Sequence, residues 1–361
     1  MRVLIGFADA LAAPEAAWSL HDDGFEVHVF ARAGSRPAVA RSGKVTCHQV
    51  TAPERDAQAC ADDVARLVDE LAPAAVLPLD DHAVWVCDRV PGAPVAGPTG
   101  DHARLALDKQ RQLALAERAG FAVPQTGARG PWMVKPALAV ALKDGVLTRP
   151  TGRITSDVSR VAEPRLVQSV LGGVGEGVFG LATDSGVHAL SAHRRVRMMN
   201  PRGSGSSACR SIPLAVELRA PVEAFVKESG WRGIFMIELL RDSAGVPWFM
   251  ELNGRAWGSM ALAVARGYHY PAWAVRSRLD PGFEPPEPVD PPHLTARHLG
   301  RDLVHLAAVL AKGGAPRLGT VLAVLTPRRG QRLYNRRRGE FGVFAADTLA
   351  TLRTQLVRSG R

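Results

Sequence analysis

Apolar and polar residues in the first eighty positions follow the spacing of strands and helices in turn. An apolar run rich in branched side chains at 2–7 precedes a helical pattern at 12–22 and a second apolar run at 25–30. Strand, helix and strand in succession predict the start of a parallel α/β sheet. A helix over 56–72 leads into a further apolar strand at 74–81, which extends the same sheet.

Two adjacent acidic residues end that last strand. Asp80 and Asp81 lie where the carboxyl end of a strand in an open α/β sheet meets ligands. Alternatively, Asp81 caps the helix that follows. No G-x-G-x-x-G motif follows the first strand, and Gly6 alone is weak evidence for a dinucleotide site.

Pro/Gly-rich stretches at 91–100 and 280–292 indicate boundaries. The expected fold class is therefore α/β combined with α+β. We expect an N-terminal domain with a parallel α/β sheet over 1–95, a second domain over 96–280, and a Pro-rich linker with a basic, mainly helical extension over 281–361.

The middle of the chain changes from helical to strand-like patterning. A helix is predicted over about 101–119, WMVKP is read as an apolar strand, the chain turns strand-like from 166, and a second helix spans about 214–229. The segments GIFMIELL and VPWFMELN flank a turn at RDSAG, which predicts a β-hairpin.

This hairpin carries the most informative chemistry. Glu251 and Asn253 share one face of their strand, and Glu238 lies nearly opposite on the partner strand. Two carboxylates and an amide oxygen suit Mg²⁺, which takes waters and phosphate oxygens as its other ligands. Arg255 is close enough in sequence to reach an anion beside that metal. As an alternative, an ordinary hairpin presents its acidic residues to solvent, but here both glutamates stand among apolar neighbours.

Only six of the 45 basic side chains are lysines, so the chain prefers arginine. Lys109 follows Asp108 on the predicted helix, and Lys135 ends the apolar segment PWMVKP. Either lysine alone is typical of a surface position. Together, upstream of an acidic hairpin, they favour a phosphate clamp.

The segment LVQSVLGGVGEGVF joins an apolar strand to glycines that let the backbone approach a planar ligand. Backbone groups of Gln168, Ser169 and Val170 suit an adenine edge, and Glu176 suits ribose hydroxyls. A simple turn is the alternative for this segment.

The order of these parts resembles the ATP-grasp superfamily, of the carboxylate–amine ligase type. The resemblance covers roughly residues 1–275 and runs through Asp108-Lys109, VKP, LVQSVLGGVGEGVF, Glu238 and ELNGR, followed by WGS and GYHYP. The E-x-N-x-R element with a glutamate 13 residues upstream is the specific part. It implies a Rossmann-like domain followed by a two-lobed fold that grips ATP between antiparallel sheets.

The resemblance also implies a reaction, in which ATP phosphorylates a carboxylate and an amine or similar nucleophile attacks the acyl phosphate, releasing ADP and phosphate. By matching position, Lys109 and Lys135 would hold phosphates, and Arg255 would stabilise the acyl phosphate or its attack. The implied contacts are Gln168, Ser169 and Val170 for adenine, Glu176 for ribose, and Glu238, Glu251 and Asn253 for Mg²⁺, with Mn²⁺ as a substitute. Small-molecule carboxylate and amine substrates follow, and a homodimer is compatible.

One departure from the family concerns the loop that covers phosphates. The segment after VKP has no glycine pair, whereas NPRGSGSSACRS at 200–211 is rich in glycine and serine. That loop, with Arg195 and Arg197 just before it, is a candidate to close over phosphates or substrate. A surface loop with solvated arginines is the alternative.

Composition narrows the classes of protein. With 46% hydrophobic and 22% charged residues the chain is typical of a globular protein. No apolar stretch reaches the length of a membrane span, and the N-terminus does not fit a signal peptide because Asp9 interrupts its apolar run. Four cysteines without a C-x-x-C pair favour reduced thiols, so we expect a cytoplasmic protein.

The net charge of +10 is concentrated near the end, where residues 326–361 hold nine arginines against Glu340 and Asp347. A solvated basic face is the first interpretation, and contact with nucleic acid or an anionic surface is the second. Three functions remain open: the ligase; a biotin-independent carboxylase that activates bicarbonate; and a non-catalytic nucleotide-binding module whose basic tail docks on a partner.

Overall fold

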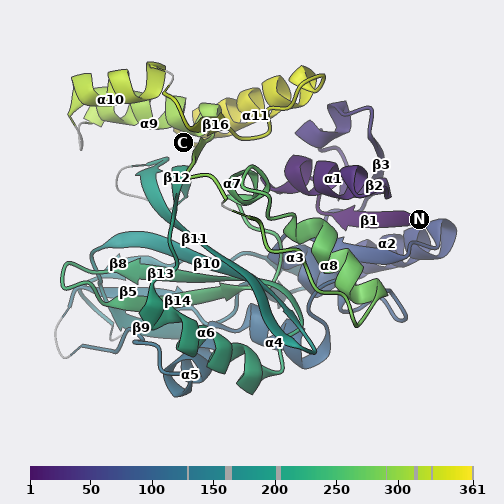
Figure 1. Ribbon diagram of the computed structural model, residues 1–361, viewed down its shortest axis with the longest axis horizontal. Helices are drawn as coiled ribbons and strands as arrows, with labels where there is room; N and C mark the ends of the chain where they lie inside the picture. The colour runs from purple at the N-terminus through teal and green to yellow at the C-terminus, as the bar shows by residue number, and fades with distance from the viewer. Residues whose placement is uncertain are drawn as a thin grey trace.

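A computed structural model describes residues 1–127, 130–158, 165–200, 205–289, 291–312, 316–326 and 328–359. Figure 1 shows a parallel sheet at one side, a larger sheet through the centre, and the C-terminal helices across the top. Four sheets are described, with strand orders β3-β2-β1-β4, β14-β13-β10-β11-β12-β15-β16, β8-β5-β9 and β6-β7.

The N-terminal parallel sheet confirms the expected strand–helix alternation. Its strands and helices are β1 (Arg2–Gly6), α1 (Ala13–Asp22), β2 (Glu26–Arg32), η1 (Ala38–Arg41), β3 (Val45–Val50), α2 (Ala57–Leu71), β4 (Ala75–Pro78) and α3 (Asp81–Cys87). All neighbouring strands of this sheet pair in parallel. The sequence pattern did not reveal β3, because its side chains are mostly half-buried and polar at the sheet edge.

The seven-stranded sheet is antiparallel except at its last pair, β15 with β16. Its strands are β10 (Val174–Thr183), β11 (Gly186–Met198), β12 (Ser206–Ile212), β13 (Gly233–Arg241), β14 (Pro247–Asn253), β15 (Thr295–Arg297) and β16 (Gln331–Leu333). The smaller sheets contain β5 (Trp132–Pro136), β6 (Ala141–Lys143), β7 (Val146–Thr148), β8 (Arg153–Thr155) and β9 (Arg165–Ser169). The predicted hairpin is confirmed as β13 and β14.

Helices cover one face of the large sheet and leave the other face for the site. The apolar side chains of β13 and β14 that include Leu239 and Phe249 pack against α5 (Lys109–Arg118) and α6 (Val216–Ser229). The helix predicted over 214–229 is therefore confirmed as α6. Because side chains alternate along a strand, Glu238 projects to the opposite face from Leu239. Two further helices, α7 (Met260–Val264) and α8 (Tyr270–Leu279), pack toward the N-terminal sheet.

The single helix predicted over 101–119 is wrong. The chain forms α4 (Gly100–Leu107) and then α5, with a break at Asp108. The Asp108 carboxylate accepts hydrogen bonds from the backbone N–H groups of Gln110 and Arg111, so it caps α5. Lys109 is thus the first residue of a helix, and its backbone N–H donates to the carbonyl of Ala137 at 2.8 Å.

The C-terminal segment is not a solvated tail. Besides α9 (Leu299–Lys312), α10 (Arg317–Leu325) and α11 (Phe341–Ser359), it supplies β15 and β16 to the large sheet. In Figure 1 this segment spans the top of the molecule, and α11 reaches toward the N-terminal domain. The extension is mainly helical, as predicted, but the sequence pattern did not reveal β15 and β16, because short strands in an arginine-rich sequence leave no apolar alternation. The domain boundaries near 95 and 280 stay predictions.

The turn after β14 is tightly packed, and a single substitution can test this packing. A Cβ atom at Gly254 would clash with the indole ring of Trp231, which is completely buried, and would lie 3.2 Å from Cβ of Ala106. We expect Gly254→Ala to lower the free energy of unfolding by about 1–3 kcal/mol, since overpacked cores must shift backbone or side chains. Chemical denaturation measures this. Gly43→Ala is the control, because nothing lies within 4 Å of its added Cβ; equal effects would contradict the packing argument.

Candidate active site

Two glutamates face each other across the hairpin. Glu238 on β13 is paired with Glu251 on β14, and Met236 is paired with Asn253, so these two acidic side chains and the amide share one face of the sheet. The amide Nδ2 of Asn253 lies 3.5 Å from Oε1 of Glu251. The glutamate side chains are only 21% and 31% exposed. The structure thus brings the three predicted metal ligands together.

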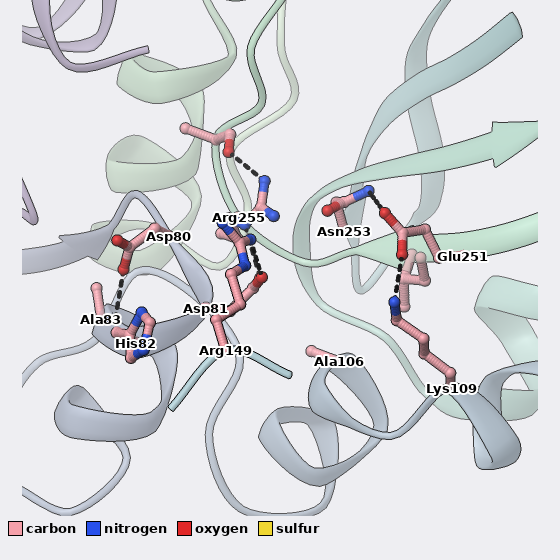
Figure 2. Close-up of polar contacts among 12 residues, drawn as sticks. Asp80, Asp81, His82, Ala83, Ala106, Lys109, Arg149, Glu251, Asn253 and Arg255 are labelled. Carbon is pink, nitrogen blue, oxygen red and sulfur yellow. Dashed lines mark hydrogen bonds and ion pairs between the residues drawn. The ribbon is translucent and has the colours of Figure 1, made fainter. Parts of the chain in front are cut away.

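Two lysines, one from α5 and one from β5, lie near this acidic pair. Nζ of Lys109, at the start of α5, lies 3.2 Å from Oε2 of Glu251. Although burial opposes it, Lys109 holds the pKa of Glu251 below its usual value. Burial and the charge of Lys109 lower the pKa of Lys135 on β5, while both glutamates raise it. Figure 2 shows Lys109 pointing at Glu251 from the helix terminus.

An arginine reaches Glu238 across β10, a strand that contains glycines. Nη2 of Arg195, on β11, lies 2.7 Å from Oε1 of Glu238, although β10 separates the two strands. A Cβ atom at Gly175 would lie 2.6 Å from Cδ of Arg195, so only glycine leaves room for this path. Burial, with the adjacent Glu251, raises the pKa of Glu238, and Arg195 partly offsets the rise. Gly175 therefore admits an arginine side chain, where sequence analysis expected close backbone approach to a ligand.

Asp81 joins the N-terminal domain to the same region. Its carboxylate accepts from Nε of Arg255 at 2.9 Å and from Nη2 of Arg149 at 2.6 Å, as Figure 2 shows. Burial alone would raise the pKa of Asp81, but the two guanidinium groups outweigh it and hold that pKa well below its usual range. The alternative of Asp81 as a helix cap is wrong, because Asp80 caps α3 through the backbone N–H of Ala83 at 2.7 Å.

The sequence pattern did not reveal a glutamine that fixes the strand carrying Glu251 and Asn253. Gln112 on α5 is 1% exposed, and its side-chain amide makes both hydrogen bonds to the backbone of Leu252, at 2.8 and 3.1 Å. It therefore holds β14 between Glu251 and Asn253. A polar residue on the apolar face of a predicted helix was the available signal, but its partner is 140 residues away.

A small apolar cavity adjoins Lys135. It is lined by Pro124, Met133, Lys135, Gln168, Ser169, Val170, Leu171 and Met250. The predicted adenine segment, Gln168 to Val170, thus lies beside the predicted phosphate lysine. The Gln168 side chain itself is buried and directed to the carbonyl of Pro124 at 3.5 Å, so the backbone and Val170 are what the segment offers a ligand.

Two predicted residues are not brought to the site. Glu176 is paired with Leu239 and so lies on the helix-covered face, where its carboxylate binds Arg194 and Arg241 at 2.7 and 2.9 Å. The geometry gives its predicted ribose contact no support. Arg197 binds the buried Asp302 of α9, so its predicted phosphate or substrate contact gains no support either.

The segment 200–211 also differs from the predicted loop. Residues 206–211 belong to β12 in the large sheet, and 201–204 lie outside the described residues. The segment that follows VKP instead forms the ribbon of β6 and β7.

The donor set fits a metal that arrives with a ligand. Across the described ranges, no three His, Cys, Asp or Glu side chains gather to hold an ion. Glu238, Glu251 and Asn253 offer carboxylate and amide oxygens, which Mg²⁺ prefers, but two acids leave most of its six positions to water or phosphate oxygens. These residues therefore fit Mg²⁺ bound to a nucleotide rather than a permanently held structural ion.

Solved structures share this architecture. Rhizobium etli pyruvate carboxylase is similar to the chain with a TM-score of 0.63 and 16% identity over 81% of this chain, but this chain spans only 30% of its length. The biotin carboxylase domain of Hydrogenobacter thermophilus 2-oxoglutarate carboxylase matches 79% of this chain and 71% of its own at a TM-score of 0.60 and 15% identity. L-amino acid ligase from Bacillus licheniformis matches 77% of this chain and 73% of its own, with a TM-score of 0.55 and 17% identity.

These proteins are ATP-grasp enzymes. The chain has the ATP-grasp fold. No sequence-family model matches it, and no curated protein matches its sequence, so the ATP-grasp likeness comes from the fold together with the residues above. Among the described helices, no segment combines the length and apolarity that crossing a membrane requires.

The Asp81 ion pairs predict a pH-dependent stability. A carboxyl with a depressed folded-state pKa adds stability above its unfolded pKa of about 4, and this is lost as pH falls through the folded value. We expect Asp81→Asn to lower the free energy of unfolding by about 2 kcal/mol at pH 7. The difference from the parent protein should stay constant above about pH 5 and shrink below about pH 4.

Urea denaturation between pH 3 and 8 measures this difference. Asp69→Asn is the matched control, because the side chain of Asp69 is exposed. A gap between Asp81→Asn and the parent that does not depend on pH would show that the Asp81 carboxylate is not held by these arginines.

Proposed function

We propose that the chain is an ATP-dependent ligase, which phosphorylates a small carboxylate and joins the acyl phosphate to an amine or similar nucleophile with release of ADP and phosphate. The observation that carries the proposal is the pair of facing glutamates with a lysine on each side. Glu238 and Glu251 are directly opposed, while Lys109 and Lys135 approach from α5 and β5. Phosphoryl transfer needs this kind of charge placement more than covalent chemistry.

The nucleotide would lie between β5 and the hairpin. The cavity beside Val170 and Met250 would take the adenine, with backbone groups of Gln168 and Ser169 at its edge. Lys135 lines the same cavity, so it would meet the phosphates next to the base. Lys109 would follow at the far end of the phosphate chain, near Glu251.

Glu238, Glu251 and Asn253 would hold Mg²⁺ with the phosphate oxygens. When bound, the ion neutralises charge on the transferred phosphoryl group. In the free protein Lys109 and Arg195 neutralise the two glutamates instead. These cations would then shift from carboxylate to phosphate oxygens as the nucleotide enters. Gln112 would keep β14 in place during this exchange.

Arg255 would meet the acyl phosphate. It lies beyond the metal ligands and beside Asp81, at the junction with the N-terminal domain. The neighbouring cavity is lined by Asp81, Lys109, Arg149, Glu251 and Asn253, together with apolar and amide residues. Lys109 and Arg149 on its wall would bind a carboxylate substrate.

A carboxylase that activates bicarbonate is the second candidate. The domain of 2-oxoglutarate carboxylase that resembles this chain was solved with bicarbonate and MgADP, and as a dimer.

A purified-protein screen for phosphate release, with ATP, Mg²⁺ and pooled carboxylic acids and amino acids, tests the ligase. Release that needs both an acid and an amine supports it, whereas release with bicarbonate alone supports the carboxylase. No release with any pool favours the nucleotide-binding module. A homodimer and a cytoplasmic location belong to the same proposal.

The metal assignment predicts that Glu251→Gln abolishes turnover. The amide keeps the size of the side chain but removes one of the two carboxylate charges that would bind the ion. We expect at least a hundredfold loss of phosphate release, with an unchanged circular dichroism spectrum. Glu228→Gln, on the exposed end of α6, is the control. Near-normal turnover at saturating Mg²⁺ would remove Glu251 from the metal site.

The assignment of Arg255 predicts a separation of binding from rate. An interaction made mainly in the transition state lowers kcat when removed and leaves ground-state binding intact. Arg255→Ala should keep near-normal ATP affinity by calorimetry and lose roughly a hundredfold in kcat. If Arg255 merely anchors Asp81, the variant will lose stability while its kcat stays normal. A collapse of ATP affinity would make it a ground-state phosphate ligand instead.

A further inference from the structure

The C-terminal segment contains a cavity that the proposed reaction does not use. Its volume is about 660 Å³, which falls in the range of small-molecule sites. It lies by β16, the edge strand opposite β14, with five strands between them. The cavity is therefore separate from the candidate active site. Its charged lining consists of Arg297, Arg328, Arg332, Arg336, Arg337 and Arg338.

The positive charge of this cavity is largely uncompensated. None of its lining residues is acidic. Within the described ranges, four of the arginine side chains form no ion pair or hydrogen bond, and all four are exposed at the cavity; they are Arg328, Arg332, Arg336 and Arg338. Like charges brought together repel one another, so such a cluster favours binding of an anion.

The backbone that carries Arg336 and Arg338 is held in place by contacts of its neighbours. Between Arg336 and Arg338, the guanidinium of Arg337 makes two hydrogen bonds to Asp22 of α1, at 2.7 and 2.8 Å. The adjacent Asn335 is 1% exposed and donates to Asp347 at 2.9 Å and, through its backbone, to Glu15 at 3.1 Å.

The rest of the cavity wall is fixed in the same way. Arg332 lies on β16, which pairs with β15. Arg297 on β15 is bound to Asp302 at 3.0 Å and to the carbonyl of Ala323 at 3.2 Å. The backbone around the cluster is therefore held in the fold at several points, unlike that of a solvated tail.

We propose that this cavity binds a ligand that carries at least two phosphate groups. Guanidinium groups match phosphate oxygens in paired hydrogen bonds, and each phosphate ester brings up to two charges and three acceptor oxygens. Four free guanidinium groups around one cavity suit two such groups. Leu325, Leu333 and Phe341 line the cavity too, so an organic portion can pack beside the phosphates. The source is either a soluble phosphate compound or a lipid headgroup.

Calorimetry of the full-length protein with inorganic pyrophosphate tests the site. Because the ATP site also takes phosphates, Lys135→Ala is measured in parallel to remove that component. The cavity variant is the double change Arg332→Gln with Arg336→Gln. The matched control is Arg329→Gln with Arg353→Gln, which removes the same charge from exposed arginines of the same segment that do not line the cavity.

We expect a pyrophosphate-binding component that survives Lys135→Ala and the control but weakens at least tenfold in the cavity variant. Thermal unfolding confirms that each variant is folded, and Arg338→Gln repeats the test if the double variant is not. Equal weakening by both double variants would show only a net-charge effect and would overturn the site. So would the absence of any component beyond the one that Lys135→Ala removes.

Vesicles identify the source. If vesicles of phosphatidylcholine with cardiolipin, which carries two phosphate groups, bind the protein and displace pyrophosphate, whereas pure phosphatidylcholine does not, the ligand is a lipid headgroup. If neither vesicle competes while pyrophosphate still binds, it is a soluble compound. Duplex oligonucleotide binding that both double variants reduce equally would mark a diffuse basic surface and contradict the cavity.

Discussion

The placement of two glutamates opposite each other on the hairpin is the constraint that organises the rest of this structure. Glu238 and Glu251 share one face of β13 and β14, where like charges repel and partial burial adds to the penalty. Each carboxylate is therefore matched by a cation. Lys109 comes from the start of a helix, and Arg195 from two strands away.

Several features of the backbone follow from that requirement. The break at Asp108 starts α5 at the position from which Lys109 reaches Glu251. The absence of a side chain at Gly175 lets Arg195 lie across β10. Gln112 then fixes β14 by its backbone, so the acidic pair keeps its register. In the proposed ligase the same cations would serve the phosphates of the nucleotide once Mg²⁺ compensates the two glutamates.

Charge is organised differently at the opposite edge of the sheet. There four of six arginines gather without matching carboxylates, and the backbone beside them is held by contacts with α1 and α11. The C-terminal segment thus ties the first helix of the chain to the last strands of the large sheet. Because Tyr334 and Asn335 are buried in this junction, the segment is part of the folded core and not an appendage.

The local sequence pattern was sufficient to predict the position of a side chain where its partners lie nearby in the sequence. The alternation in IFMIELL and WFMELN, with one short turn between them, determined by itself that Glu238, Glu251 and Asn253 share a face. The strand–helix order of the first eighty residues determined the parallel sheet. Long-range pairing decided the rest. Glu176 is one residue away from Gly177, which pairs with Glu238, and a shift of one residue in a strand moves a side chain to the opposite face.

The same holds for the arginines, since nothing in the sequence AHRRVRM distinguishes Arg195, which reaches Glu238, from Arg197, which binds Asp302 more than a hundred residues later. The sequence alone determined which chemical groups stand on each strand, because alternation is a property of the local backbone. Tertiary structure decided which groups meet, because strand register and the partners of long charged side chains are set by contacts between segments far apart in the chain.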